Sequence, residues 1–387
     1  MKNIKKKKIA YVINHASFFY SHILPIALEA KKKYDITLFH GLFGSQTMES
    51  YALKKLEKLK IKKKKIKIIP GSLNILNEAR SLIQLYFLLK KYDPDLIHCA
   101  TPKGILYGGI ISKILKIKSI VIFNSGMGFL FSNKLNLFEK FAKYFYTFIL
   151  NGFILRQKNK KIIIENKDDY KFFKKQYKLR NYEIVLVRGS GVDLKKVKKI
   201  SISTNKIVLL PSRVIKEKGI MEFVKAAEKL KKKYPSWKFV IAGALDYRKK
   251  SKFSNSEILF FKRSNSVSLV GFIKNIYGLY KQAGIVCLPS YREGFSKVLQ
   301  EAAALGIPIV TTNVIGCKDS IIPGKTGELC EPQNYKSLEK KLEYLILNKR
   351  IRMQYSKNAR KFAEKYFNLN NVISNNIEQY KILMKNE

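Results

Sequence analysis

Two glutamates, Glu293 and Glu301, lie eight positions apart in the segment 285–312. Glu293 precedes a predicted helix, and Glu301 lies one turn inside it. A helix start offers main-chain N–H groups without intrahelical partners and the positive end of a dipole, which together suit a phosphate. Nearby carboxylates could bind ribose and sugar hydroxyls, although two glutamates on a solvated surface turn would have the same spacing. The spacing alone therefore leaves a nucleotide-sugar site and a surface turn open.

The two glutamates are positioned by a strand, a helix and a second strand. The apolar run Ile285–Leu288 predicts a strand buried on both faces of a parallel sheet. Ser296 is a good N-cap, and strong helix formers follow it over Lys297–Leu305. Ile309–Thr312 predicts the next strand. The segment is thus one βαβ unit with charged residues in its first turn.

Signature residues on both sides of the glutamates extend the pattern. The segment reads PSYREGF at 289–295 and EAAALGIPIV at 301–310, and resembles the E-x7-E signature of the family 4 retaining glycosyltransferases. In the N-terminal half, IHCATPKG at 97–104 and SGMGFLF at 125–131 resemble one branch of that family. The branch comprises bacterial transferases that add an N-acetylhexosamine-type sugar to undecaprenyl-diphosphate-linked saccharides.

The resemblance implies the GT-B fold, in which two facing Rossmann-like, doubly wound α/β domains have a cleft between them. Short apolar runs alternate with helical stretches along the chain, which also favours parallel sheets. We expect an N-terminal acceptor-binding domain at 1–194 and a nucleotide-sugar-binding domain at 205–365. A final helix within 366–387 is expected to cross back onto the first domain. In the first domain we expect a basic helix over 48–65 and a strand at Lys67–Ile69.

The resemblance also implies roles for individual residues. Arg213 and Lys218 resemble the R…KG element of the family, whose cations bind the donor diphosphate. Arginine offers a planar fork to phosphate oxygens and lysine a point charge. With Glu293, which would position the donor sugar, they are the candidate catalytic residues. Stabilisation of the leaving group by these cations would require neither a metal nor another cofactor.

The remaining candidates lie in loops that follow predicted strands, where ligands of open α/β sheets collect. Glu301 would hold the ribose. The donor-binding candidates are Glu301, Gly294, Phe295, Ser296, Lys297, Val298, Phe272 and Ile273. The acceptor-side candidates are His15, Thr101, Lys103, Gly126 and Gly128. His15 could act as an acid, a base or a donor, although a single histidine after a strand is more often structural.

The formal net charge of +48 favours polyanionic partners, either nucleic acid or an anionic membrane surface. A lysine-rich composition without any such partner is the alternative. RRM, KH, zinc-finger and helix-turn-helix signatures are absent, so we expect no specific nucleic-acid partner. No apolar run reaches the roughly 18 residues needed to span a bilayer. The spacing of the four cysteines argues against a zinc site and favours a reducing cytoplasm.

One stretch, 135–155, places aromatic residues at helical spacing between lysines. We expect this helix to pack into the N-terminal core. The alternative is a surface helix that dips into a membrane interface. The aromatic and apolar members of the stripe are Phe138, Phe141, Tyr144, Phe145, Phe148 and Ile149.

Together these features predict a cytoplasmic retaining glycosyltransferase, peripherally bound to the inner face of the cell membrane. It would move a sugar from a nucleotide-sugar, UDP-HexNAc by the resemblance, to a lipid-linked saccharide in surface polysaccharide or glycan synthesis. A UDP-sugar 2-epimerase-like enzyme of the same fold is the nearest alternative. A basic nucleic-acid-binding protein is the second.

Overall fold

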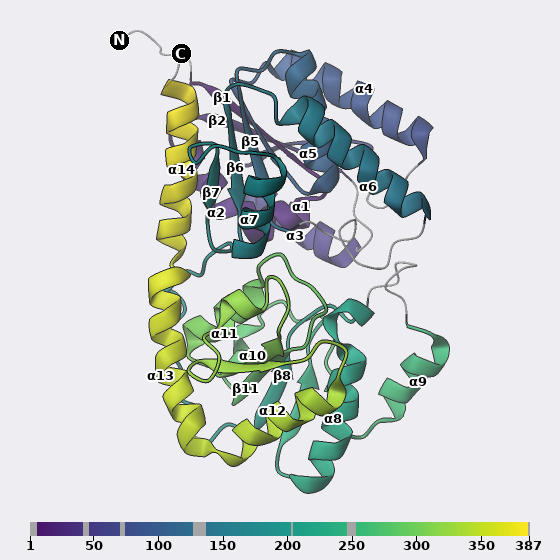
Figure 1. Cartoon of the computed structure of the whole chain (residues 1–387), viewed down its shortest axis with the longest axis vertical. Coiled ribbons are helices and arrows are strands. Elements are labelled where there is room, and N and C mark those ends of the chain that lie inside the picture. Colours follow the sequence, from purple (N-terminus) through teal and green to yellow (C-terminus); the bar gives the residue numbers. More distant parts are fainter. Residues whose placement is uncertain are drawn as a thin grey trace. The chain divides into compact units, whose positions relative to one another are not determined.

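The computed structural model describes residues 6–41, 46–69, 74–126, 137–202, 204–245 and 253–385. The chain divides into two compact units (Figure 1). The first comprises Met1–Ser190 with Asn371–Glu387, and the second comprises Gly191–Asn370. The expected boundaries were at 194–205 and 366, whereas residues 194–202 pack their apolar side chains on the core of the second unit.

The first unit is built on a seven-stranded sheet in the order β3-β2-β1-β4-β5-β6-β7, and every pairing among these strands is parallel. The order reverses between β1 and β4. The central strands are buried along nearly their whole length, which is why they read as continuous apolar runs. The strands are β1 Lys8–Ile13, β2 Asp35–His40, β3 Lys62–Lys65, β4 Leu96–Ala100, β5 Ser119–Asn124, β6 Lys160–Ile164 and β7 Ile184–Leu186.

The edge strand β3 consists of four lysines and corrects the prediction for this region. The expected helix over 48–65 ends earlier, as α3 at Lys58, and the strand expected at Lys67–Ile69 lies instead at Lys62–Lys65. An edge strand pairs on one side only, so its side chains can remain in water, and lysines discourage pairing with another chain. The apolar pattern that marks a buried strand is therefore missing here.

Helices cover both faces of the first sheet. One face carries α1 Ala16–Phe18, the π-helical turn η1 Phe19–Ile23, α2 Leu24–Lys31, α3 Gln46–Lys58 and α14 Leu369–Lys385. The other carries α4 Ile75–Tyr92, α5 Pro102–Ile114, α6 Leu137–Ile149, η3 Leu150–Ile154 and α7 Lys167–Gln176.

Helix α14 joins the first unit although the whole second unit precedes it in the chain. Tyr380 and Met384 belong to the buried core on its face of the sheet. The Tyr380 hydroxyl hydrogen-bonds to Nδ1 of His98 on β4 at 2.7 Å. Nζ of Lys7 donates to the carbonyl of Met384 at 2.9 Å. Apolar and polar contacts together therefore attach the helix to the sheet.

Helix α6 forms as expected, but its aromatic face does not pack into the core. Tyr146 and Ile149 contact the core, whereas Phe141, Tyr144 and Phe148 are exposed. The side chain of Phe138 lies outside the described residues. The helix is thus a surface helix whose solvent-facing side is aromatic.

The second unit has a six-stranded parallel sheet in the order β10-β9-β8-β11-β12-β13, which reverses between β8 and β11. The strands are β8 Ile207–Leu210, β9 Lys238–Ile241, β10 Val267–Leu269, β11 Ile285–Leu288, β12 Ile309–Thr312 and β13 Gly327–Cys330. The helices are η4 Lys216–Lys218, α8 Ile220–Lys233, α9 Asn255–Arg263, α10 Tyr277–Tyr280, α11 Lys297–Leu305, η6 Lys318–Ser320, α12 Tyr335–Leu347 and α13 Lys349–Tyr366. The bounds predicted for β11, α11 and β12 are confirmed.

Within the described segments, every helix is either too short or too polar to cross a bilayer. All four cysteines lie in these segments, and each is buried with an unpaired thiol.

Candidate active site

The candidate donor residues follow β8 and β11, the two neighbouring strands at which the order of the second sheet reverses. Leu209 of β8 pairs with Val286 of β11, so the two strands end close together. At such a switch point the following helices turn to opposite faces and leave a crevice at the carboxyl ends of the strands. Arg213 follows β8 and Glu293 follows β11.

The loops after β8 and β11 contact each other directly. The amide of Tyr291 donates to the carbonyl of Glu217 at 2.9 Å. Gly219 has a φ of 69°, and a Cβ at this position would lie 2.1 Å from the carbonyl oxygen of Pro289. Only glycine combines this conformation with so close an approach. The glycine therefore brings Lys218 beside the loop that contains Glu293.

Glu293 is held by side chains from both loops. The Lys218 ammonium forms an ion pair with its Oε1, and the Ser290 hydroxyl donates to the same oxygen at 2.7 Å. Both charged side chains are largely buried, which strengthens their attraction relative to a surface pair. Gly316 packs beneath, and a Cβ there would lie 2.3 Å from the carbonyl oxygen of Glu293. The carboxylate and the ammonium are thus fixed in one place.

Helix α11 begins where the sequence predicts. Ser296 is the N-cap, and its hydroxyl accepts from the amide of Leu299 at 3.4 Å. Phe295 turns its ring into the core and packs edge-on against Phe367, with 5.6 Å between ring centroids. Val298 also packs on this core. For Phe295 in particular, the main chain is the part that can contact a donor.

Glu301 lies on α11 between two tyrosines of α10. The Tyr280 hydroxyl donates to its Oε2 at 3.3 Å and the Tyr277 hydroxyl to its Oε1 at 3.5 Å. Burial raises the pKa of Glu301, while the charge of Lys297 and the two tyrosine donors act in the opposite direction. The carboxylate is therefore held in orientation by two neutral donors.

The two remaining donor candidates are farther along the sheet. Phe272 and Ile273 follow β10, the edge strand, which is separated from β8 by β9. Both are partly buried. They share the carboxyl edge with the glutamates, and their assignment to the nucleotide base remains a prediction.

In the first unit the loops after β1 and β4 lie at the other switch point, between the strands where that sheet reverses. The amide of Asn14 donates to the Thr101 hydroxyl at 3.0 Å, and the Asn14 side-chain oxygen accepts from the amide of Gly104 at 2.8 Å. Thr101 has a φ of 69°, which is strained for a residue with a branched side chain. These contacts fix the shape of the two loops.

The other acceptor-side candidates have structural partners as well. Nδ1 of His15 accepts from the amide of Phe18 at 3.2 Å, so the ring caps α1. Nζ of Lys103 donates to both carboxylate oxygens of Glu78 at 2.7 Å. The amide of Gly126 donates to the Asn124 side chain at 3.4 Å. Gly128 lies outside the described residues.

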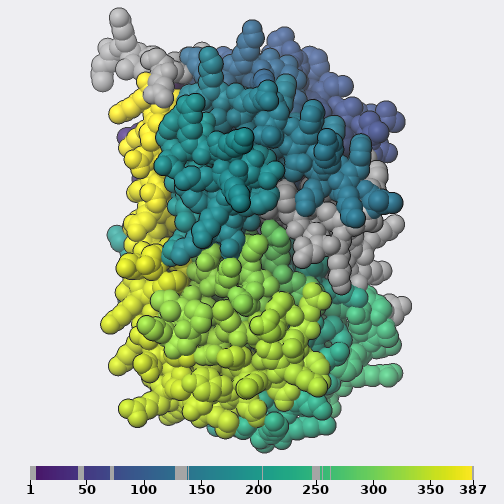
Figure 2. Space-filling view, in the orientation of Figure 1, coloured from purple at the N-terminus to yellow at the C-terminus, as the bar shows by residue number. Residues whose placement is uncertain are grey.

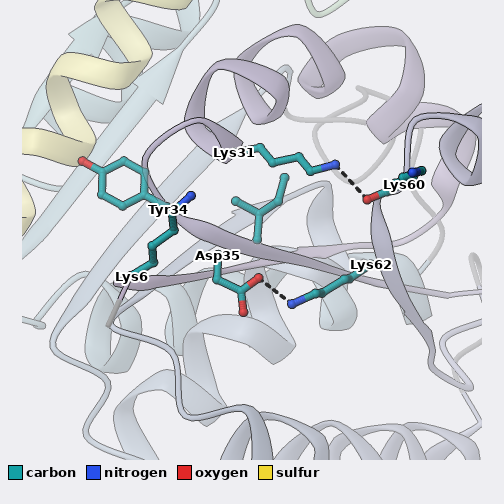
Figure 3. Close-up of a pocket in the computed structure, with 7 residues that line it drawn as sticks. Lys6, Lys31, Tyr34, Asp35, Lys60 and Lys62 are labelled. Atoms are coloured by element: carbon teal, nitrogen blue, oxygen red, sulfur yellow. Dashed lines mark hydrogen bonds and ion pairs between the residues drawn. The ribbon is translucent and has the colours of Figure 1, made fainter. Parts of the chain in front are cut away.

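A cavity of about 260 Å³ lies elsewhere, at the amino ends of β1, β2 and β3 (Figure 3). It is lined by lysines and by Asp35, which accepts from Nζ of Lys62 at 2.8 Å. Nζ of Lys31 points toward the carbonyl of Lys60 and donates to it at 2.9 Å. This cavity is on the opposite edge of the sheet from the loops after β1 and β4, so it is separate from the candidate site.

Sequence reasoning missed several residues that hold the site together. Ser290 is three positions before Glu293, and this short S-x-x-E spacing is a signal that could have identified it. Tyr277 and Tyr280 belong to a different helix from Glu301, and no local pattern connects them. Asn14 lies in the predicted loop immediately after β1, but its hydrogen bonds to Thr101 and Gly104 come from a distant part of the sequence and leave no local signal.

A doubly wound sheet in each unit, with the E-x7-E helix after β11, defines a glycosyltransferase of the GT-B fold. The family model described as glycosyl transferases group 1 matches residues 192–362, and the one described as glycosyl transferase 4-like matches residues 8–159. The two matches together identify the chain as a glycosyltransferase whose sequence is similar to family 4.

Similar sequences come from bacterial glycan synthesis. The chain is 25% identical over 375 residues to the N,N'-diacetylbacillosaminyl-diphospho-undecaprenol alpha-1,3-N-acetylgalactosaminyltransferase of Campylobacter jejuni, covering 93% of this chain and 94% of that protein. It is 25% identical over 306 residues to the capsular polysaccharide biosynthesis glycosyltransferase CapM of Staphylococcus aureus, covering 76% and 78%.

Solved structures share the fold. A crystal structure of HepE from Anabaena in complex with UDP and glucose has a TM-score of 0.75 and 18% identity, over 97% of this chain and 99% of that one. Sucrose-phosphate synthase from Thermosynechococcus elongatus has a TM-score of 0.77 and 16% identity, over 99% and 100%.

Proposed function

We propose that this glycosyltransferase moves an N-acetylhexosamine-type sugar from its UDP conjugate to a saccharide linked to a lipid diphosphate. The observation that carries the proposal is the contact between Lys218 and Glu293, which joins the two loops of the switch point. The relative from Campylobacter jejuni, whose name specifies a diphospho-undecaprenol acceptor and an N-acetylgalactosaminyl group, matches over nearly the full length of both chains. That relative supports the substrate class.

In this proposal the second unit binds the donor. Arg213, Lys218 and the main-chain amides at the start of α11 hold the diphosphate and stabilise the charge that develops as it leaves. Because a cation assists departure, the reaction needs no metal for this step. Lys218 already faces an anion, Glu293, so it is in place before the donor arrives.

The two glutamates then orient the ends of the donor. Glu301, held by Tyr277 and Tyr280, accepts hydrogen bonds from the ribose hydroxyls. Glu293 positions the transferred sugar beside its anomeric carbon. The new bond forms on the face from which the diphosphate departs, and the departing phosphate oxygen takes the acceptor proton. The configuration at the anomeric carbon is thereby retained.

The first unit receives the acceptor. Loops after β1, β4 and β5 contribute Thr101, Lys103 and Gly126, and Asn14 fixes their shape. A lipid-linked acceptor lies in a membrane, and the net charge of +48 favours an anionic leaflet. We therefore propose that the enzyme works at the inner face of the cell membrane, from the cytoplasm.

The test is to incubate the protein with a panel of UDP-sugars and a bacterial lipid extract, and to weigh the lipid products by mass spectrometry. One N-acetylhexosamine added to a lipid-diphosphate saccharide is the expected product. Anomeric NMR of that product should show the α configuration of the donor. Release of a free epimerised UDP-sugar, with no lipid product, would instead support the epimerase alternative.

A further inference from the structure

Helix α4 presents an apolar stripe to solvent. Leu76, Ile83 and Phe87 recur at helical spacing, on the side opposite the buried Leu85 and Leu89. The three exposed side chains are 68%, 58% and 63% accessible. An apolar stripe on a helix usually packs against another part of the protein or against a partner. Among the described residues, no part of the first unit covers the stripe on α4.

Helix α6 presents a second and more aromatic stripe. Its solvent-facing side chains are between 51% and 85% exposed, and they are Leu137, Phe141, Tyr144, Phe145 and Phe148. Among the described residues, every phenylalanine that is more than half exposed lies on α4 or α6. The concentration of exposed aromatic area on two helices marks an interaction surface.

The two stripes face away from the same side of the first sheet. Helices α4 and α6 both pack on the core of that side, with α5 beside α4 and the η3 turn that continues α6 beside α5. Both helices reach the surface of the unit in the space-filling view (Figure 2). We call the combined surface the aromatic face, formed by Leu76, Ile83, Phe87, Leu137, Phe141, Tyr144, Phe145 and Phe148.

The charged side chains on these two helices indicate what kind of partner the surface binds. Their acidic side chains do not face solvent freely, because Glu78 forms an ion pair with Lys103 at 2.7 Å and Glu139 is buried. The exposed charged side chains of α4 and α6 are cations, namely Arg80, Lys90, Lys91 and Lys140. Aromatic side chains flanked by cations fit the interface of an anionic bilayer, where rings lie among headgroups and cations meet phosphates. A second copy of this strongly cationic chain would be repelled.

We propose that the aromatic face docks the enzyme on anionic membranes by inserting its aromatic side chains into the interface. The inference rests on the proposed lipid-linked acceptor and adds the surface that reaches it. Attachment thus combines two forces: lysines and arginine draw the protein to the leaflet, and the aromatic rings then hold it when salt screens those charges.

The first test is vesicle flotation of the full chain with phosphatidylcholine alone and with added phosphatidylglycerol. The variant F141Q/F145Q/F148Q should bind anionic vesicles at least about tenfold more weakly than wild type, because it loses the three rings that insert into the bilayer interface. The matched control L259Q/L347Q removes exposed apolar side chains from the second unit and should bind like wild type. Wild-type binding by the triple variant would overturn the proposal.

A fluorescence test separates insertion from charge attraction. The chain has one tryptophan, Trp237, which is buried in the second unit. Phe148→Trp adds a reporter on the aromatic face. Vesicles with brominated acyl chains should quench this variant and leave wild-type fluorescence unchanged. Binding without quenching would show that charge alone holds the protein, and would contradict insertion.

Two controls separate this proposal from others. With a short-chain, water-soluble acceptor the triple variant should keep wild-type turnover, since none of the three substituted phenylalanines is a candidate site residue. If wild type transfers sugar to no acceptor, the proposed function fails while flotation still decides the docking surface. A wild-type dimer that the triple variant converts to monomers in sedimentation would assign the face to a second copy and overturn the proposal.

Discussion

At the switch point of the second unit, neighbouring loops meet through charged side chains, Lys218 against Glu293. At the switch point of the first unit they meet through neutral groups, the Asn14 amide and the Thr101 hydroxyl. A charged pair can respond to a charged ligand, because an arriving diphosphate competes for the same cation. A neutral network instead fixes the main chain. Mutations in the two places should therefore separate into effects on turnover and effects on folding.

The two units also bury titratable groups of opposite kinds. His98 in the first sheet is fully buried, and burial lowers its pKa to about 3. Burial raises the pKa of Glu301 in the second unit. In both cases burial disfavours the charged form. Lowering the pH should therefore destabilise the first unit through His98, whereas the contribution of Glu301 to the stability of the second unit is lost as the pH rises through its raised pKa.

The largest expected effect tests the charged pair. Lys218→Ala should lower kcat/KM by about 100- to 1,000-fold, because it removes a cation from the leaving group and leaves Glu293 without its counter-charge. The matched control is Lys216→Ala, two residues earlier in the same turn, whose ammonium pairs with Glu257 at 3.0 Å. Steady-state kinetics with a UDP-sugar measures both. Equal losses in the two variants would remove Lys218 from the site.

The next effect tests the buried histidine. An unfolded histidine binds its proton near pH 6.5 and folded His98 only near 3, so the unfolded state holds more protons between these values. The free energy of unfolding should therefore fall as pH is lowered, by about 2 kcal/mol at pH 5. In His98→Gln this acid dependence should flatten. The free energy of opening can be measured by hydrogen exchange of the α14 amides between pH 5 and pH 8, in steps of about one pH unit.

A smaller effect tests the neutral network. Asn14→Ala leaves the amide of Gly104 without its acceptor and should reduce the free energy of unfolding of the first unit by about 1–3 kcal/mol. Urea unfolding followed by far-UV circular dichroism gives this value. The unfolding transition of the second unit, followed by the fluorescence of Trp237, should occur at the same urea concentration as in wild type. A loss of turnover with unchanged stability would instead give Asn14 a direct role on the acceptor.

The smallest effect tests the orientation of Glu301. Tyr277→Phe removes one donor to the carboxylate, and should raise KM for the UDP-sugar by about fivefold, equivalent to about 1 kcal/mol. A donor lacking the ribose 2′-hydroxyl should lose this sensitivity if Glu301 binds the ribose. In wild type the hydrogen bond from Tyr277 lowers the pKa of Glu301, so its removal should raise that pKa. The pH dependence of donor binding should therefore shift to higher pH in the same variant. An equal KM change for both donors would point to packing alone.

The comparison explains which parts of the molecule could be predicted from sequence. The bounds of β11, α11 and β12 follow from local signals, a buried apolar run and a serine N-cap, and the structure has them at the predicted residues. Strand β3 could not be predicted in this way, because an edge strand of lysines carries no apolar pattern. Periodicity identified α6 but gives no information on whether its aromatic side faces the core or the solvent.

The site shows the same division. The side chains of Glu293 and Lys218 belong to signature motifs, and their contact requires only that neighbouring strands end together. The tyrosines that hold Glu301 come from α10, and their approach depends on how α10 and α11 pack. The sequence suggested a chemical role for His15, whereas in the structure its ring caps the first turn of α1. Tertiary packing, which a single sequence does not display, decides these cases.

Helix α14 has a consequence for how the protein is made. A ribosome delivers residues 191–370 before it delivers the helix that completes the first unit. Until then the groove that receives Tyr380 and Met384 stays open, and the hydroxyl that meets His98 is missing. The second unit can thus mature first, although it is synthesised later than most of its neighbour. A nascent chain stalled near residue 370 should present a folded second unit and an incomplete first unit that chaperones still recognise.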